Sequence, residues 1–264
     1  MRTLGILWRR HGPRVTSLAG LALAWQVAAF SLPAYLVPGL PAVLGEFAAI
    51  FVSPDLLGHF ALTIGRLMLG MVVSFLVGTA LAIGMSLSER FERHLMPLIE
   101  FLMGIPALAL VVLIIIWVPF VELRIFVVLL LVCFPFFTIQ ILDGIKGVSK
   151  DLIDMLRAFR PTRRQLFAKL ILPGVVPAVL TSWKLTIAYG TRAVIIAELV
   201  GTTSGIGNRL LSAQEKFEMD DALAWTLALV AFLWASQSVL TWLERRLLRW
   251  RPAALARVEQ FGSV

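Results

Sequence analysis

The chain has 264 residues, of which 59% are hydrophobic and 15% are charged, and its mean hydropathy is +0.89. A soluble domain is usually about 45–50% apolar and about 25% charged, so these values exclude an ordinary soluble domain and indicate a membrane protein. Disorder is excluded as well, because disordered chains are poor in apolar residues. The net charge of +8 is typical of basic cytoplasmic loops in a membrane protein.

Six segments are apolar enough, and long enough, to cross a bilayer as helices, which takes about 20 residues each. They are Val15–Tyr35, Phe60–Leu87, Leu95–Pro119, Ile125–Leu142, Val175–Val200 and Ala222–Leu243. The first is interpreted as a retained helix and not a signal peptide, because no small-residue cleavage site closes its long apolar run. We therefore expect an all-α membrane protein with one transmembrane domain over residues 1–264.

Basic residues predict the orientation, because Lys and Arg are enriched in cytoplasmic loops. With the N-terminus inside, the outside segments hold only Arg66, Arg124, Arg209 and Lys216. The inside segments hold Arg2, Arg9, Arg10, Arg14, Arg90, Arg93, Lys146, Lys150, Arg157, Arg160, Arg163, Arg164, Lys169, Arg245, Arg246, Arg249, Arg251 and Arg257. Both termini, including a tail at about 244–264, are thus expected in the cytoplasm.

Two spans carry small or helix-breaking residues. Gly70, Ser74, Gly78 and Ala82 follow one another at steps of four in the second span, which favours the close approach of another helix. Gly104-Ile105-Pro106 interrupts the third span, because proline lacks a backbone donor and breaks a helix. A break at mid-depth is either structural or shapes a pathway, as in transporters.

The longest polar stretch is the basic loop at about 143–172. A helix is expected from Ser149, and Arg160-Pro161-Thr162 ends it because the residue before proline avoids helical geometry. Thr162 is expected to cap a second short helix, Arg163–Leu170, with Gln165 completing a capping box. Such a helix–turn–helix suits docking of a partner, with Phe159 as an apolar anchor; the alternative is a solvated loop that touches lipid head groups.

Three ionisable residues lie in the fifth span: Lys184, Arg192 and Glu198. Charges within a membrane are costly and mark functional candidates. Lys184 is expected to extend its amine toward the cytoplasmic interface. Arg192 is expected deeper in the membrane. There it either pairs with a carboxylate, Glu198 of a second copy among them, or faces a water-filled cavity, where it could serve an anionic solute.

No enzymatic site is predicted. Cys133 is the single cysteine and the three histidines lack ligand spacing, so neither a disulfide nor a metal site is expected. The glycine-rich segment 201–207 lacks the strand and the lysine of a nucleotide loop. The competing classes are an ion-gradient-driven carrier or channel, which would need a repeat or a charged relay, and an intramembrane enzyme, which would need a nucleophile with a base.

Several segments, in this order, resemble the membrane permease subunit of binding-protein-dependent ABC importers, in particular the nitrate, sulfonate, taurine and bicarbonate branch. The resemblance covers about Leu36 to Ala224 and includes a broken helix at Ile105-Pro106 and a cytoplasmic signature at Asp154–Pro173. The remaining matching segments are Leu36–Val43, Thr63–Gly70, Ala197–Leu199 and Ser204–Gly207. The family signature usually reads Glu-Ala-Ala followed by a glycine; here Asp154, Met155 and Leu156 stand at the first three positions and Arg160 at the glycine.

The resemblance implies a homodimer that forms a solute pathway, two ATPase subunits that bind ATP and magnesium, and an extracytoplasmic solute-binding protein. It implies a multi-pass protein of the bacterial plasma (inner) membrane and a small anion, such as a sulfonate, taurine, nitrate or bicarbonate, as solute. The residues expected to dock the ATPase are Asp154, Arg157, Ala158, Phe159, Arg160, Pro161 and Thr162. The pathway candidates are Gly104, Pro106, Arg192 and Glu198.

Overall fold

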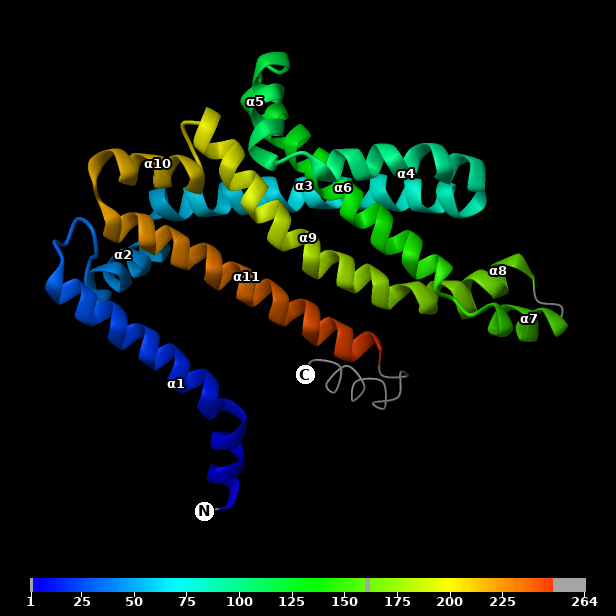
Figure 1. The fold of residues 1–264 in the computed structure, drawn as a ribbon, viewed down its shortest axis with the longest axis horizontal. Helices are drawn as coiled ribbons and strands as arrows, with labels where there is room; N and C mark the ends of the chain where they lie inside the picture. Colours follow the sequence, from blue (N-terminus) through cyan, green and yellow to red (C-terminus); the bar gives the residue numbers. More distant parts are fainter. Residues whose placement is uncertain (1, 160–161, 249–264) are drawn as a thin grey trace. The chain divides into compact units, whose positions relative to one another are not determined.

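The computed structural model describes residues 2–159 and 162–248, and in these ranges the chain is helical (Figure 1). Its elements are α1 (Arg2–Ser31), α2 (Leu40–Val52), α3 (Pro54–Leu87), α4 (Glu89–Gly104), α5 (Ala107–Trp117), α6 (Val121–Lys146), α7 (Lys150–Ala158), α8 (Arg163–Leu166), the π-helical η1 (Phe167–Ile171), α9 (Leu172–Gly201), α10 (Ile206–Lys216) and α11 (Met219–Leu247).

Four of the expected spans are confirmed as long apolar helices: α3, α6, α9 and α11. Each begins or ends a few residues beyond its apolar run. Pro54 starts α3, where proline is tolerated because its missing N–H has no helical partner. Within the described residues, Ala19–Ser31 of α1 is a shorter apolar helix, so the crossing of the first segment stays a prediction.

The third expected span, Leu95–Pro119, is not one helix. It consists of α4 and α5, which are bent by 99° at the break between them. The Ser88 hydroxyl accepts a hydrogen bond from the Phe91 N–H at 3.3 Å and starts α4 six residues before the expected boundary. An unexpected helix, α2, fills much of the segment that follows α1.

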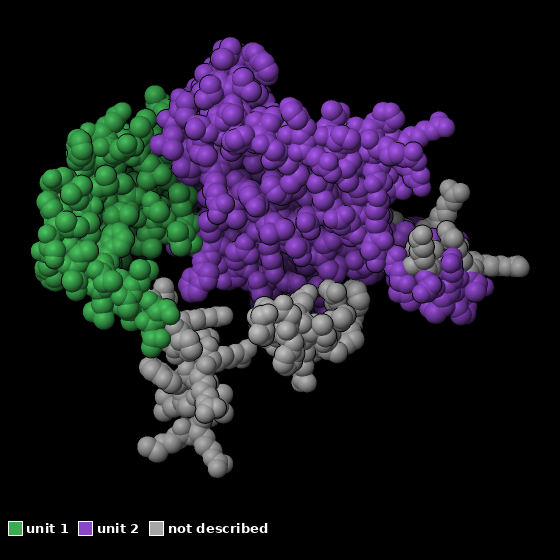
Figure 2. Space-filling view, in the orientation of Figure 1, with its two compact units in different colours: residues 1–63, 202–230 green, residues 64–201, 231–264 purple. Residues whose placement is uncertain are grey.

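The chain divides into two compact units (Figure 2). Unit 1 comprises residues 1–63 and 202–230, and it includes α1, α2, α10 and the first turns of α3 and α11. The Trp25 indole N–H donates to the Pro38 carbonyl at 2.9 Å and ties α1 to the segment before α2. His59 and Thr63 of α3 accept hydrogen bonds from the Gly205 and Ile206 N–H groups at 2.9 and 2.8 Å. These bonds satisfy backbone donors at the start of α10, which otherwise lack partners.

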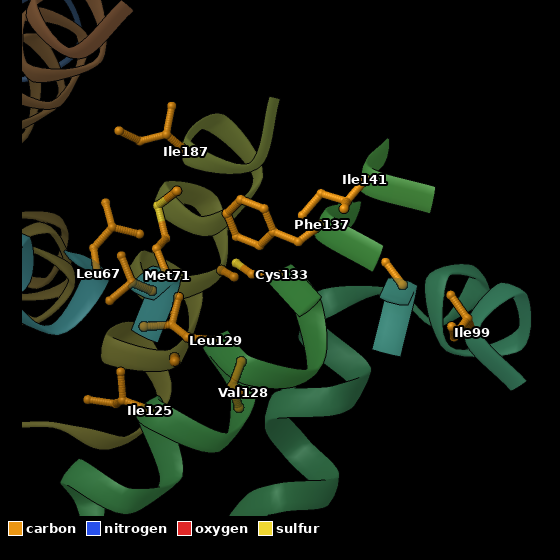
Figure 3. Close-up of a cluster of buried hydrophobic side chains, with 14 of the residues drawn as sticks. Leu67, Met71, Ile99, Ile125, Val128, Leu129, Cys133, Phe137, Ile141 and Ile187 are labelled. Carbon is orange, nitrogen blue, oxygen red and sulfur yellow. The ribbon is translucent and has the colours of Figure 1, made fainter. Parts of the chain in front are cut away.

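Unit 2 comprises residues 64–201 and 231–264. Its core gathers buried apolar side chains from α3, α6 and α9, among them Leu67, Leu129, Phe137 and Ile187 (Figure 3). Helices α6 and α9 pack along each other. Gly144 of α6 allows this contact, because a β-carbon there would collide with Ala178 of α9.

The small residues of α3 provide the close contact that their spacing predicts. A β-carbon at Gly70 would lie 2.8 Å from Leu129, and one at Gly78 would lie 2.7 Å from Phe137 of α6. The Ser74 hydroxyl is buried and donates to the Gly70 carbonyl at 2.7 Å within its own helix. Helices in lipid associate through such packing of small residues.

Candidate functional site

The break between α4 and α5 is where the sequence places it. Ile105 has an extended backbone, with φ −80° and ψ 123°, as expected for a residue that precedes proline. No atom lies within 4 Å of a β-carbon built on Gly104, so this glycine is not required by packing within the chain. Pro106 is the residue that separates the two helices, because it cannot donate to the backbone ladder.

A cavity of about 210 Å³ lies beside this break in unit 2. It is lined by apolar side chains of α4, α5 and α6 and by one tyrosine of α9: Leu102, Met103, Ile105, Ala107, Leu110, Leu131, Val132, Phe136 and Tyr189. The rings of Phe136 and Tyr189 are stacked with their centroids 4.4 Å apart. The lining of the cavity is therefore apolar and includes two stacked aromatic rings.

Arg192 lies one helical turn beyond Tyr189. In the single chain Arg192 is exposed, and its burial within the membrane assembly stays a prediction. Its Cζ lies 5.9 Å from the centroid of the Tyr189 ring, within the range of a cation–π contact. No ion pair of Arg192 occurs within residues 2–159 and 162–248.

Glu198 is fully buried and pairs with Arg66 of α3, whose Nη1 donates to a carboxylate oxygen at 2.8 Å. Arg66 also donates through Nε to Glu122 at the start of α6, at 2.9 Å, and through Nη2 to the second oxygen of Glu122. One guanidinium thus joins α3, α6 and α9. The sequence analysis missed this cluster and counted Arg66 only among the basic residues of the outside segments. The signal that could have found it is an arginine within the apolar run of α3.

A second arginine fixes the chain between α5 and α6. Arg124 is 9% exposed, and it donates to the carbonyls of Val118 and Pro119 at 3.3 and 3.4 Å. Gly201 at the end of α9 leaves room for its guanidinium, which a β-carbon there would meet. Arg124 thus satisfies backbone acceptors that the end of α5 leaves without helical partners.

The predicted capping box is present at the start of α8. The Thr162 N–H donates to the Gln165 amide oxygen at 2.9 Å, and the Gln165 N–H donates to the Thr162 hydroxyl at 3.3 Å. Phe159, directly after α7, is 78% exposed. Of the other docking candidates, Asp154 and Ala158 lie in α7, as does the backbone of Arg157; Arg160 and Pro161 are outside the described residues.

The expected end of the second short helix is wrong. Instead of stopping before Leu172-Pro173-Gly174, α8 continues through η1 directly into α9. The segment at about 143–172 is therefore attached to the apolar helix α9 without a flexible joint at this end. A π-helical turn inside a helix is rare and is frequently found at functional sites.

Lys184 of α9 has a partner in the described residues. Its amine donates to the Glu244 carboxylate of α11 at 2.5 Å, and Gln237 of α11 donates to the Lys184 carbonyl at 2.7 Å. The snorkelling interpretation did not foresee this pair. Lys146 at the end of α6 pairs in the same way with Glu92 of α4.

The sequence of residues 70–250 matches the family described as the binding-protein-dependent transport system inner membrane component. The chain belongs to this family. As a permease of this kind, it is a multi-pass inner-membrane protein of a transport system that also has ATPase and solute-binding subunits.

Individual permeases resemble the chain over most of its length. It is 31% identical to SsuC of Escherichia coli (strain K12), a permease protein named for aliphatic sulfonate transport, over 89% of this chain and 90% of that protein. It is 31% identical to the taurine transport system permease protein TauC of the same strain, over 87% and 86% of the two chains. SsuC of Bacillus subtilis (strain 168) is 29% identical over 83% and 79%.

Two solved structures show the same fold. The MetNI methionine ABC transporter in an inward-facing conformation gives a TM-score of 0.59 at 16% identity, covering 74% of this chain and 99% of that chain. An amino acid ABC transporter with histidines gives a TM-score of 0.63 at 15% identity, covering 76% and 98%. The permease thus has the type I ABC importer fold that its sequence resembles.

Proposed function

We propose that this permease forms the pathway for a small anion as a homodimer and couples it to two ATPase subunits through the segment at about 143–172. Relatives named for aliphatic sulfonates and taurine support this solute class, and the sequence resemblance extends it to nitrate and bicarbonate. A solute-binding protein delivers the anion at the outer face, and both termini are cytoplasmic. ATP and magnesium bind to the ATPase subunits, and this chain has no catalytic role.

The observation that carries the proposal is the exposed Phe159 directly after α7, together with the capping box that starts α8. An aromatic ring that is exposed in the single chain is suited to a pocket of a partner protein. Closure of the ATPase pair would move α7 and α8, and the continuity of α8, η1 and α9 would carry that movement into the membrane helix. The two sides of the pathway would then open alternately.

The test is Phe159→Ala in the permease co-expressed with its ATPase and reconstituted with its binding protein. We expect ATPase co-purification and solute-stimulated ATP hydrolysis to fall at least tenfold, because a buried aromatic anchor is typically worth about 2 kcal/mol or more. Phe120→Ala removes another exposed ring, 72% exposed, far along the chain, and should leave ATPase co-purification unchanged. Normal assembly and stimulation in the Phe159 variant would reject this docking surface.

A further inference from the structure

We propose that the cavity beside the helix break and the guanidinium of Arg192 together bind an alkanesulfonate-type anion, one with a charged head and a short apolar tail. This inference rests on the proposed function, because it selects among the anions named there. It favours an alkanesulfonate over taurine, nitrate and bicarbonate.

The charge of Arg192 is the first part of the argument. A charged side chain nine residues before the end of a membrane helix is costly unless it faces protein, water or an opposite charge. Glu198, the nearest acidic residue on α9, is fully buried and held by Arg66. The Arg192 guanidinium therefore has no carboxylate within the described part of the chain, and it can make charge-assisted, bidentate hydrogen bonds to an anionic head group.

The apolar cavity is the second part. Drug-sized ligands occupy pockets of about 300–1,000 Å³, so a cavity of about 210 Å³ suits only a few carbon atoms. Its lining side chains are aliphatic, aromatic or methionine apart from the Tyr189 hydroxyl. Each methylene group buried there should tighten binding by about fourfold, the equivalent of the transfer free energy of one CH₂ group.

Tyr189 connects the two parts. Its ring lines the cavity and stacks on Phe136, while the Arg192 guanidinium lies 5.9 Å from the centroid of the same ring. Tyr189 and Arg192 are three residues apart and so lie on neighbouring positions of one helix face. A head group on Arg192 would place a short tail across Tyr189 and into the cavity.

This arrangement discriminates among the candidate anions. Nitrate and bicarbonate have no tail and would gain nothing from the cavity. Taurine carries an ammonium group at the end of its tail, and no lining residue is acidic. Transfer of that ammonium group to an apolar wall without a partner is strongly unfavourable.

The test measures thermal unfolding of the purified full-length permease in lipid nanodiscs, without ATPase or binding protein, at constant ionic strength. Millimolar butane-1-sulfonate should raise the unfolding temperature, because a ligand that binds only the folded state stabilises it. Ethanesulfonate, two methylene groups shorter, should bind about fifteenfold more weakly, and taurine and nitrate should produce no shift. The absence of a butanesulfonate shift, or an equal shift with nitrate, would overturn the proposal.

Variants separate the two parts of the site. Arg192→Gln should abolish the shift, Arg192→Lys should retain part of it, and Arg90→Gln, an exposed arginine elsewhere in the chain, should leave it intact. Ala107→Phe fills the cavity and should remove the gain from the longer tail, whereas Ala109→Phe, two residues along α5, should not. A full shift in Arg192→Gln, or an unchanged tail dependence in Ala107→Phe, would refute the site.

The results of this binding assay do not depend on the contact between the permease and its ATPase. If Arg192→Gln cannot be purified in folded form, Arg192→Lys and the pair Ala107→Phe and Ala109→Phe still test the proposal. Because the assay contains no ATPase, failure here leaves the Phe159 docking surface standing, and failure of that surface leaves this assay unaffected.

Discussion

Arg66 has a charged environment that its neighbours in the sequence do not indicate. It lies among apolar neighbours on α3, yet its guanidinium is almost enclosed by Glu198, fully buried, and by Glu122, whose side chain is 67% exposed. A charge taken out of water is tolerated only when it is paired and hydrogen-bonded. The two carboxylates are therefore not equivalent: one is sealed in with the arginine, and the other reaches it from the surface.

This difference gives a prediction for single substitutions. Arg66→Gln removes the guanidinium that pairs with the buried Glu198 carboxylate and should cost about 3–5 kcal/mol of unfolding free energy. Glu122→Gln removes an exposed partner and should cost about 0–1 kcal/mol. Denaturant titration of the two purified variants in the same detergent would measure both values.

The double variant Arg66→Met with Glu198→Leu is the informative control. Replacing a buried ion pair by apolar side chains of similar size is often neutral, so the double variant should be more stable than Arg66→Gln alone. Equal losses in Arg66→Gln and Glu122→Gln would show that Glu198 does not depend on Arg66.

Among the elements, the contact of α3 with α6 depends on glycine at particular turns of α3. A β-carbon at Gly78 would meet the Phe137 β-carbon at 2.7 Å and the Phe134 carbonyl oxygen at 2.9 Å. Both are fixed parts of α6, so neither can rotate away. At Gly65 of the same helix nothing lies within 4 Å.

We therefore expect opposite effects from the same substitution in one helix. Gly78→Ala should destabilise the permease by about 1–3 kcal/mol, because extra volume in a packed core forces shifts. Gly65→Ala should be neutral or stabilising by up to about 1 kcal/mol, because alanine is the better helix former. Unfolding temperatures of the two variants would test this, and a tolerated Gly78→Ala would contradict the close approach of α3 and α6.

For the whole molecule, the distribution of basic residues predicts which ends face the cytoplasm. Cysteine introduced as Ser149→Cys should be protected from a membrane-impermeant thiol reagent in intact cells, whereas Gln214→Cys should react. Both positions are exposed, and the native Cys133 is fully buried and should stay unlabelled. Labelling of Ser149→Cys in intact cells, with protection of Gln214→Cys, would reverse the predicted orientation.

The sequence alone determined the features that depend on neighbouring residues. Hydropathy predicted α3, α6, α9 and α11, because the apolar composition of a segment by itself decides whether the segment enters lipid. Proline predicted the break at Pro106, and the Thr162–Gln165 spacing predicted the capping box, because both effects act within one turn. Bend angles and continuity were not accessible in this way: the 99° between α4 and α5 and the passage of α8 through η1 into α9 depend on packing.

Only the tertiary structure decided which charges meet. Arg66 and Glu198 are 132 residues apart, and Lys184 and Glu244 are 60 apart, so no local pattern could join them. The same holds for Arg192, which is exposed in the single chain because its helix face turns away from the core that Gly190 and Val194 enter. Depth in a span follows from the sequence, but the direction in which a helix face points is set by the helices packed around it.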